Sequence, residues 1–133
     1  MLDIVMAVMV LAYGDGLDTR VGPEAEAEII LQVAEEYELN EEQTMLLVCL
    51  RRCENGPDGS EFGVLHDQPG HRSHRYKGQP RKSLRLQAQW AAGTVRDRYT
   101  GSLGLFCKKW CPGNPDQLVK NIGTYLVLMK GTK

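Results

Sequence analysis

Hydrophobic residues recur at every third or fourth position along much of the chain, and this period predicts a mainly α-helical protein. Residues 23–38 form the first such segment, and Pro23 stands where the first turn of a helix tolerates proline. Asn40 and Gln43 fit a capping box, which predicts the start of a second helix. Residues 45–50 make that helix apolar on nearly every side, so we expect it to run through the middle of the core.

A segment of different character follows the second helix. Residues 55–81 are rich in Gly and Pro and contain all three His residues. They are too polar for a core, and we expect an irregular or short β-hairpin lobe that lines a surface cleft. Helical periodicity then returns from about Ser83 to Tyr99, from a Ser102 cap to Trp110, and after Asn114. The sequence therefore predicts a single, mostly helical domain over residues 1–133.

The composition agrees with one globular domain. The chain has 133 residues, of which 42% are hydrophobic and 25% are charged, and this excludes a disordered tail, a collagen-like repeat and a multidomain enzyme. The uninterrupted apolar segment at residues 4–13 is shorter than the roughly 20 residues that a membrane-spanning helix needs. It also has no basic residue ahead of it, as a secretory signal would. We expect a buried opening segment without stable membrane insertion; the alternative is a weak export or membrane-release segment.

Charge is distributed unevenly along the chain. Residues 1–42 hold eleven of the 17 acidic residues and only Arg20 among the basic ones. A basic lobe follows, in which Lys and Arg alternate with His71, His74 and Tyr76. It could bind nucleic acid, meet the carboxylates of peptidoglycan stem peptides or anionic wall polymers, or be a solvated face. Its basic residues are Arg72, Arg75, Lys77, Arg81, Lys82 and Arg85.

Glu54 is the strongest candidate for chemistry in the sequence. It directly follows the apolar helix and precedes Asn55 and Gly56, so we expect its carboxyl group at the boundary between core and cleft. Partial burial and the negative end of a helix dipole both disfavour an ionised carboxylate, whereas Arg51 and Arg52 oppose that effect if they turn towards it. A carboxylic acid that stays protonated near neutral pH is what a general acid requires. The alternative is a solvated residue at a helix end.

The residues around Glu54 resemble the active-site segment of the lysozyme-like superfamily. The sequence CENGPDGSEFGVL at residues 53–65 is similar to the branch of lytic transglycosylases, goose-type lysozymes and phage muramidases. In that branch the catalytic Glu ends a buried helix, and a Ser-x-x-Gly-aliphatic segment forms the neighbouring cleft wall. Here Ser60, Gly63, Val64 and Leu65 match that segment.

Two later segments extend the resemblance to about residues 41–130. The sequence QWAAGTV at residues 89–95 looks like the helix that lines the far side of the groove, and residues 106–122 look like the closing segment of phage peptidoglycan-degrading domains. The chain departs from the family in three ways. His66 stands where Gln is usual, the Ala-Tyr-Asn tripeptide is absent with Tyr125 as the replacement for the family tyrosine, and the insertion at residues 66–82 is longer and more basic.

The resemblance implies a lysozyme-like helical domain that cuts the β-1,4 bond between N-acetylmuramic acid and N-acetylglucosamine. Glu54 would be the general acid, and the substrate-binding residues would be Ser60, Gly63, Val64, Leu65, Gln89 and Tyr125. A hydrolase needs a second carboxylate, about 5 Å from the acid as a nucleophile or about 6.5–9.5 Å away as a base. Asp58, Glu61 and Asp67 are the candidates, whereas a lytic transglycosylase works with one carboxyl group. The sequence leaves both mechanisms open.

The family resemblance also sets expectations about partners and location. We expect a phage-encoded monomer that binds peptidoglycan glycan strands, without nucleic acid, cofactor or metal. It would be made in the host cytoplasm before release to the periplasm or cell wall, or be carried on the virion. One rival hypothesis is a non-catalytic cell-wall-binding or virion structural domain.

The four cysteines support a further rival, a Cys-rich protein that binds metal and nucleic acid. Cys49 and Cys53 are four residues apart, as are Cys107 and Cys111, so each pair shares a helix face. Two facing pairs could remain free thiols, form one or two disulfides, or hold zinc through four thiolates. The sequence leaves these three states open.

Overall fold

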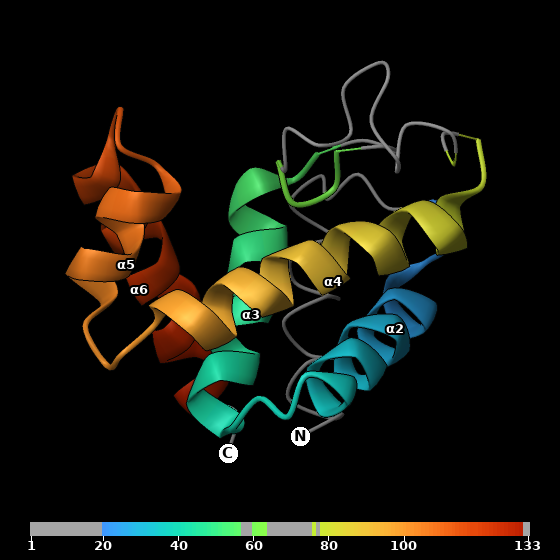
Figure 1. Cartoon of the computed structure of the whole chain (residues 1–133), viewed down its shortest axis with the longest axis horizontal. Helices are drawn as coiled ribbons and strands as arrows, with labels where there is room; N and C mark the ends of the chain where they lie inside the picture. The colour runs from blue at the N-terminus through green and yellow to red at the C-terminus, as the bar shows by residue number, and fades with distance from the viewer. Residues whose placement is uncertain (1–19, 57–59, 64–75, 77, 132–133) are drawn as a thin grey trace.

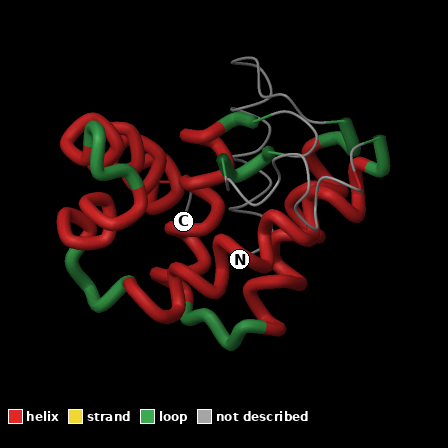
Figure 2. Tube along the Cα trace, turned by 45° about the horizontal axis from the view of Figure 1, so that its top comes forward, coloured by secondary structure: helices red, strands yellow, loops and turns green. Residues whose placement is uncertain are grey.

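Helices account for most of the structure (Figure 1). The computed structural model describes residues 20–56, 60–63, 76 and 78–131. In chain order the helices are α2 (Pro23–Glu36), α3 (Glu41–Glu54), α4 (Pro80–Arg98), α5 (Leu103–Trp110) and α6 (Pro115–Gly131). Figure 2 shows helices joined by loops, with no strand in the described parts of the chain, which confirms the mainly α-helical class.

Two predictions concern segments that the structure does not describe, or describes only in part. The apolar segment at residues 4–13 lies outside the described residues. The expected β-hairpin is absent from the described parts of residues 55–81, and residues 57–59, 64–75 and 77 lie outside them. Within the described chain, no helix has the length and apolar character needed to cross a membrane.

Helix α3 is the central element, as its sequence predicts. The predicted capping box is present: the Asn40 side chain accepts from the Gln43 backbone N–H at 2.8 Å, and the Gln43 side chain accepts from the Asn40 N–H at 2.9 Å. Such a cap stabilises a helix by about 1 kcal/mol. Every residue from Thr44 to Arg51 is buried, and burial of each large apolar side chain contributes roughly 1.5–3 kcal/mol.

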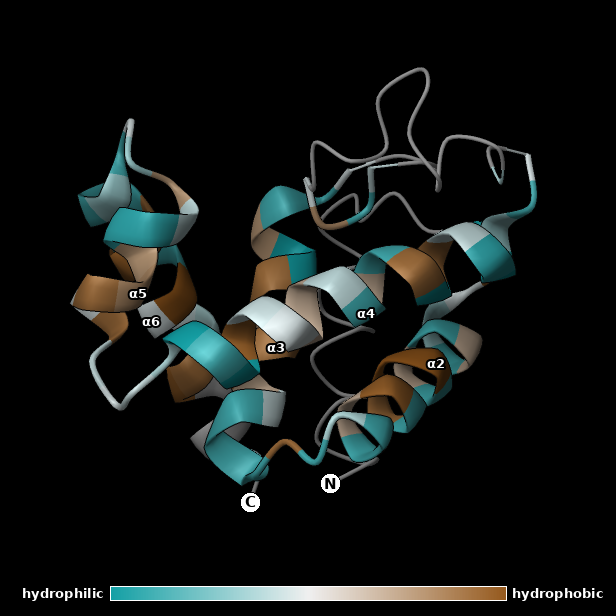
Figure 3. Ribbon diagram, viewed as in Figure 1, coloured by the Kyte–Doolittle hydropathy of each residue, from teal (hydrophilic) through white to brown (hydrophobic). Residues whose placement is uncertain are grey.

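The other helices pack around α3. Helices α2, α4 and α6 contact α3, α2 also contacts α4, and α5 packs on α6. In Figure 1, α4 crosses α3, with α2 on one side of the molecule and the α5–α6 pair on the other. Figure 3 shows hydrophobic residues concentrated in the middle of α3, whereas its first turn is hydrophilic. Helix α3 is therefore packed against three other helices, α2, α4 and α6.

The observed boundaries differ from the predicted ones in small but physical ways. Helix α2 ends at Glu36, two residues before the predicted end, and α4 begins at Pro80, three residues before Ser83. A proline at the first helical position extends α4 towards its N-terminus because that position needs no backbone donor. The prediction that residues 55–81 are excluded from the core is wrong for Phe62, which is 0% exposed.

Candidate active site around Glu54

Glu54 is the last residue of α3, and its side chain is half-buried. The helix ends there because Asn55 adopts the left-handed conformation, with φ 44° and ψ 39°, and donates its N–H to the Arg51 carbonyl. Asparagine tolerates this conformation better than most residues other than glycine. The buried helix therefore delivers one carboxyl group to its own C-terminal boundary.

Trp110, the last residue of α5, contacts Glu54 directly. Its indole Nε1–H donates to Glu54 Oε1 at 3.2 Å. Trp110 is itself held by Phe106 one turn earlier, with the two rings stacked at a centroid distance of 5.7 Å. Because an indole can only donate, Oε1 is the accepting oxygen of the carboxyl group. A proton on Glu54 is therefore best placed on Oε2.

Gly63 lies against the other side of the Glu54 carboxyl group. A Cβ atom at Gly63 would stand 3.0 Å from Glu54 Cδ and closer still to Oε2. Gly63 also has φ 66°, a conformation that side chains with a Cβ rarely adopt. Both its backbone conformation and its contact with Glu54 thus require glycine at this position.

The turn that carries Gly63 folds tightly back on the end of α3. The Gly56 N–H donates to the Glu61 carbonyl at 3.3 Å, and the Gly63 N–H donates to the Ser60 carbonyl at 2.8 Å. A Cβ at Gly56 would lie 2.6 Å from the Ser60 carbonyl carbon, so only glycine allows this backbone approach. Phe62 anchors the turn in the core. We refer to residues 56 and 60–63 together as the Gly63 turn.

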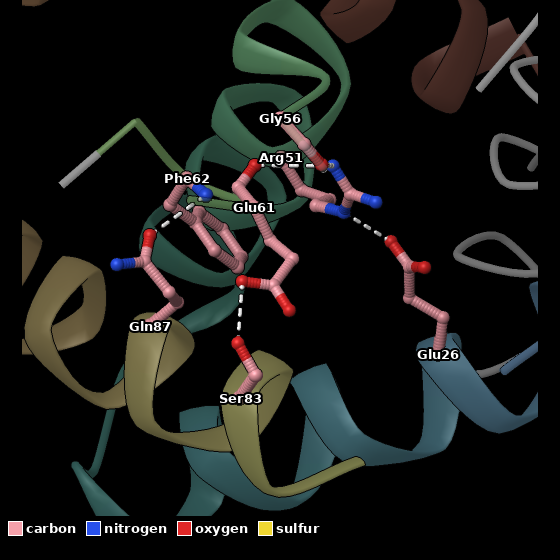
Figure 4. Close-up of polar contacts among 7 residues, drawn as sticks. All are labelled: Glu26, Arg51, Gly56, Glu61, Phe62, Ser83 and Gln87. Atoms are coloured by element: carbon pink, nitrogen blue, oxygen red, sulfur yellow. Dashed lines mark hydrogen bonds and ion pairs between the residues drawn. The ribbon is translucent and has the colours of Figure 1, made fainter. Parts of the chain in front are cut away.

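A buried polar network supports the Gly63 turn from behind (Figure 4). Arg51 forms an ion pair with Glu26 of α2, and each side chain is 1% exposed. Arg51 Nη1 also donates to the carbonyls of Gly56 at 3.2 Å and Glu61 at 3.0 Å. The network is completed by two side chains of α4: the Ser83 hydroxyl donates to Glu61 Oε1 at 3.1 Å, and Gln87 Oε1 accepts from the Phe62 N–H at 3.0 Å.

The structure describes only one of the three candidate second carboxylates. Glu61 is 5% exposed, and its carboxylate points to Ser83 in Figure 4, which favours a structural role in the turn. Asp58 and Asp67 lie outside the described residues, as do the predicted substrate-binding residues Val64 and Leu65.

Tyr125 lies near the same end of α3, where its ring is covered by a neighbouring cation. The Arg52 guanidinium carbon is 5.3 Å from the centre of the Tyr125 ring. The two arginines that precede Glu54 thus have defined partners: Arg51 in the buried network and Arg52 over Tyr125 of α6.

Gln89 belongs to a different surface. It lies two residues beyond Gln87 on α4. Residues two positions apart on a helix differ in direction by about 200° around its axis, so Gln89 points away from the Gly63 turn. It lines a polar groove of about 450 Å³ together with Tyr37, Trp90, Thr94 and Lys109. The structure therefore does not bring Gln89 into the group formed by Glu54, Gly63 and Trp110.

The basic lobe is described only in part. Lys82 lies over the Tyr76 ring, with Nζ 5.8 Å from its centre, and Arg85 forms an ion pair with Glu36 of α2. Arg81 is exposed. The remaining members, His71, Arg72, His74, Arg75 and Lys77, lie outside the described residues.

The four cysteines are free thiols: Cys49 and Cys107 are buried in the core, and Cys53 and Cys111 pack against it. Burial raises the pKa of Cys53 to about 12, and the neighbouring negative charge of Glu54 acts in the same direction. Burial likewise raises the pKa of Cys107 to about 11 and raises that of Cys49. Among the described residues, no group of three or more His, Cys, Asp or Glu residues is arranged to hold a metal ion.

The partners that organise Glu54 are not evident in the sequence. The pattern around Trp110 predicts a core or groove-wall residue, yet Trp110 is hydrogen-bonded to the candidate acid from 56 residues away. Nothing in the local sequence of Glu26, Ser83 and Gln87 distinguishes them from other polar helix residues. A charged residue directly after six apolar ones, as Arg51 is, is the one available signal of a buried ion pair.

A comparison of the chain with models of protein families, with curated proteins and with solved structures found no match.

Proposed function

We propose that the protein is a peptidoglycan-cleaving glycosidase of the lysozyme or lytic transglycosylase type, with Glu54 as its general acid. The observation that carries the proposal is the setting of Glu54 at the end of the buried helix α3. One carboxyl oxygen accepts from Trp110, and the other lies against a glycine that leaves it room. The resemblance of residues 53–65 to the active-site segment of that superfamily supplies the substrate class.

The carboxyl geometry suggests how the first step proceeds. Trp110 occupies Oε1, so the proton on Oε2 is the one available for transfer to the glycosidic oxygen. As the C1–O bond breaks, that oxygen leaves as a hydroxyl group and Glu54 becomes a carboxylate. The indole N–H then stabilises the new negative charge, and hydrogen bonds to charged groups contribute roughly 1.5–3 kcal/mol.

The second step depends on whether a second carboxylate takes part beside Glu54. Glu61 is buried in the supporting network, which disfavours it as a second carboxylate, and Asp58 and Asp67 lie outside the described residues. The proposed route uses Glu54 alone. In that route the Glu54 carboxylate accepts the proton of the muramic acid 6-hydroxyl. The oxygen of that hydroxyl group bonds to C1, which gives a 1,6-anhydro product. In the hydrolytic route, water supplies the oxygen and a second carboxylate would be required.

The test is digestion of purified Gram-negative peptidoglycan, with the soluble fragments identified by mass spectrometry. We expect fragments that end in 1,6-anhydro-muramic acid; reducing ends would indicate hydrolysis. Glu54→Gln should lower the rate by at least about 100-fold, in line with general acid catalysis. The matched control is Glu28→Gln on the exposed face of α2, which should keep full activity. Absence of fragments from the wild-type protein would refute the proposed activity.

A further inference from the structure

Arg51 is a fully buried cation that the proposed proton transfers do not use. It is 1% exposed and lies three residues before Glu54 on α3. A buried charge is expensive unless it is paired and its hydrogen-bonding groups are satisfied. Glu26 supplies the pairing charge from α2. Arg51 is distinguished by the acceptors of its other N–H groups.

The same guanidinium donates to two carbonyls of the Gly63 turn. Nη1 contacts Gly56 at 3.2 Å, where the chain leaves α3, and Glu61 at 3.0 Å, where it returns. Helix α4 holds the returning arm of the turn through Gln87 and the Phe62 N–H. Gly63, which faces the Glu54 carboxyl group, is the next residue along. Figure 4 shows Arg51 between Glu26 and the two carbonyls.

We propose that Arg51 is a positioning residue: aligned by Glu26, its guanidinium fixes the Gly63 turn against the carboxyl group of Glu54. Its catalytic consequence rests on the proposed function. Its structural consequence, the order of the turn, does not. Arg51 touches neither substrate nor reacting atoms in this role, and it acts through the placement of Gly63.

A role of Arg51 in positioning the turn can be distinguished from a role in stabilising the fold. Replacing a buried ion pair by apolar residues of similar volume is often neutral or stabilising. An apolar pair, however, donates nothing to the carbonyls of Gly56 and Glu61. The double variant Glu26→Leu/Arg51→Met should therefore stay folded while the turn loses its donors.

A milder variant guards against misfolding of the double variant. Arg51→Lys keeps a positive charge for Glu26, but a lysine presents one nitrogen in place of the planar fork that reaches carboxylate and carbonyls together. The matched control is Glu36→Leu/Arg85→Met, which removes the partly exposed ion pair between α2 and α4 outside the network.

The experiment measures amide hydrogen exchange and steady-state kinetics on the full chain. In Arg51→Lys and in the double variant, the Phe62 and Gly63 amides should exchange at least about tenfold faster, while those of residues 46–50 remain protected. The kcat should fall by about 100-fold with little change in KM, as for a group misplaced by about 1 Å. The control variant should match the wild type in amide exchange at Phe62 and Gly63, and Glu28→Gln should match it in kcat.

The outcomes distinguish this inference from the proposed function. Wild-type exchange at Phe62 and Gly63 in both Arg51 variants would overturn the inference, as would faster exchange with unchanged kcat. If the wild-type protein cuts no peptidoglycan while the exchange responds as expected, the proposed function fails and the structural part of the inference stands.

Discussion

Substitution of Gly63 by alanine tests the close contact between the turn and Glu54. At φ 66° the added Cβ costs roughly 1–2 kcal/mol in backbone strain. The Cβ would also stand 3.0 Å from Glu54 Cδ and nearer to Oε2, so the carboxyl group must move by about 1 Å to restore ordinary contact. The 3.2 Å hydrogen bond from Trp110 is then broken, which adds about 1 kcal/mol.

We therefore expect Gly63→Ala to lose about 2–3 kcal/mol of unfolding free energy, and the digestion rate to fall by about 100-fold because the acid is displaced. Urea denaturation measures the first quantity and release of soluble peptidoglycan fragments the second. Gly101→Ala is the matched control, since Gly101 also has positive φ, at 103°, but an added Cβ there would meet nothing within 4 Å. It should lose stability and keep its activity. A Gly63→Ala protein that digests at more than a tenth of the wild-type rate would refute the reasoning.

Three further predictions concern the surroundings of the site. Trp110→Phe keeps the stacking on Phe106 but removes the donor to Glu54, so kcat should fall about tenfold; an unchanged kcat would contradict the assigned hydrogen bond. Phe62→Ala should lower the free energy of unfolding by about 3–5 kcal/mol in urea titrations, and a loss below about 1 kcal/mol would contradict its place in the core. Stability should decline as the pH rises above 9, because thiols ionise near 9.0 when unfolded, whereas burial raises the pKa of Cys53 to about 12 and of Cys107 to about 11 in the folded protein. The Cys53→Ala/Cys107→Ala variant should show a smaller alkaline decline, and an equal decline would contradict this assignment.

The helices could be predicted because their signals are local. The capping box at Asn40 and the Ser102 cap each lie within four residues of the groups that they satisfy. The apolar run of α3 likewise indicates its burial without reference to any other element. The placement of Glu54 at the end of that helix follows from the same local pattern.

The surroundings of Glu54 could not be predicted because they depend on tertiary packing. Phe62 lies in a segment rich in Gly and Pro that has no helical periodicity, so the sequence pattern does not identify it as a core residue. Arg51 and Arg52 are adjacent in sequence, yet one is drawn to Glu26 of α2 and the other to Tyr125 of α6. Gln89 shares a helix with Gln87 but faces another surface, so a matched motif did not ensure a shared site.

The spacing of the contacts around Glu54 has a consequence for the order of folding. Glu26 and Arg51 are 25 residues apart, as are Phe62 and Gln87, and Glu54 and Trp110 are 56 apart. Such contacts form only after the loops between them have closed, later than the local bonds that start α3. During synthesis, Glu54 therefore leaves the ribosome well before Trp110, the residue that donates a hydrogen bond to its carboxyl group.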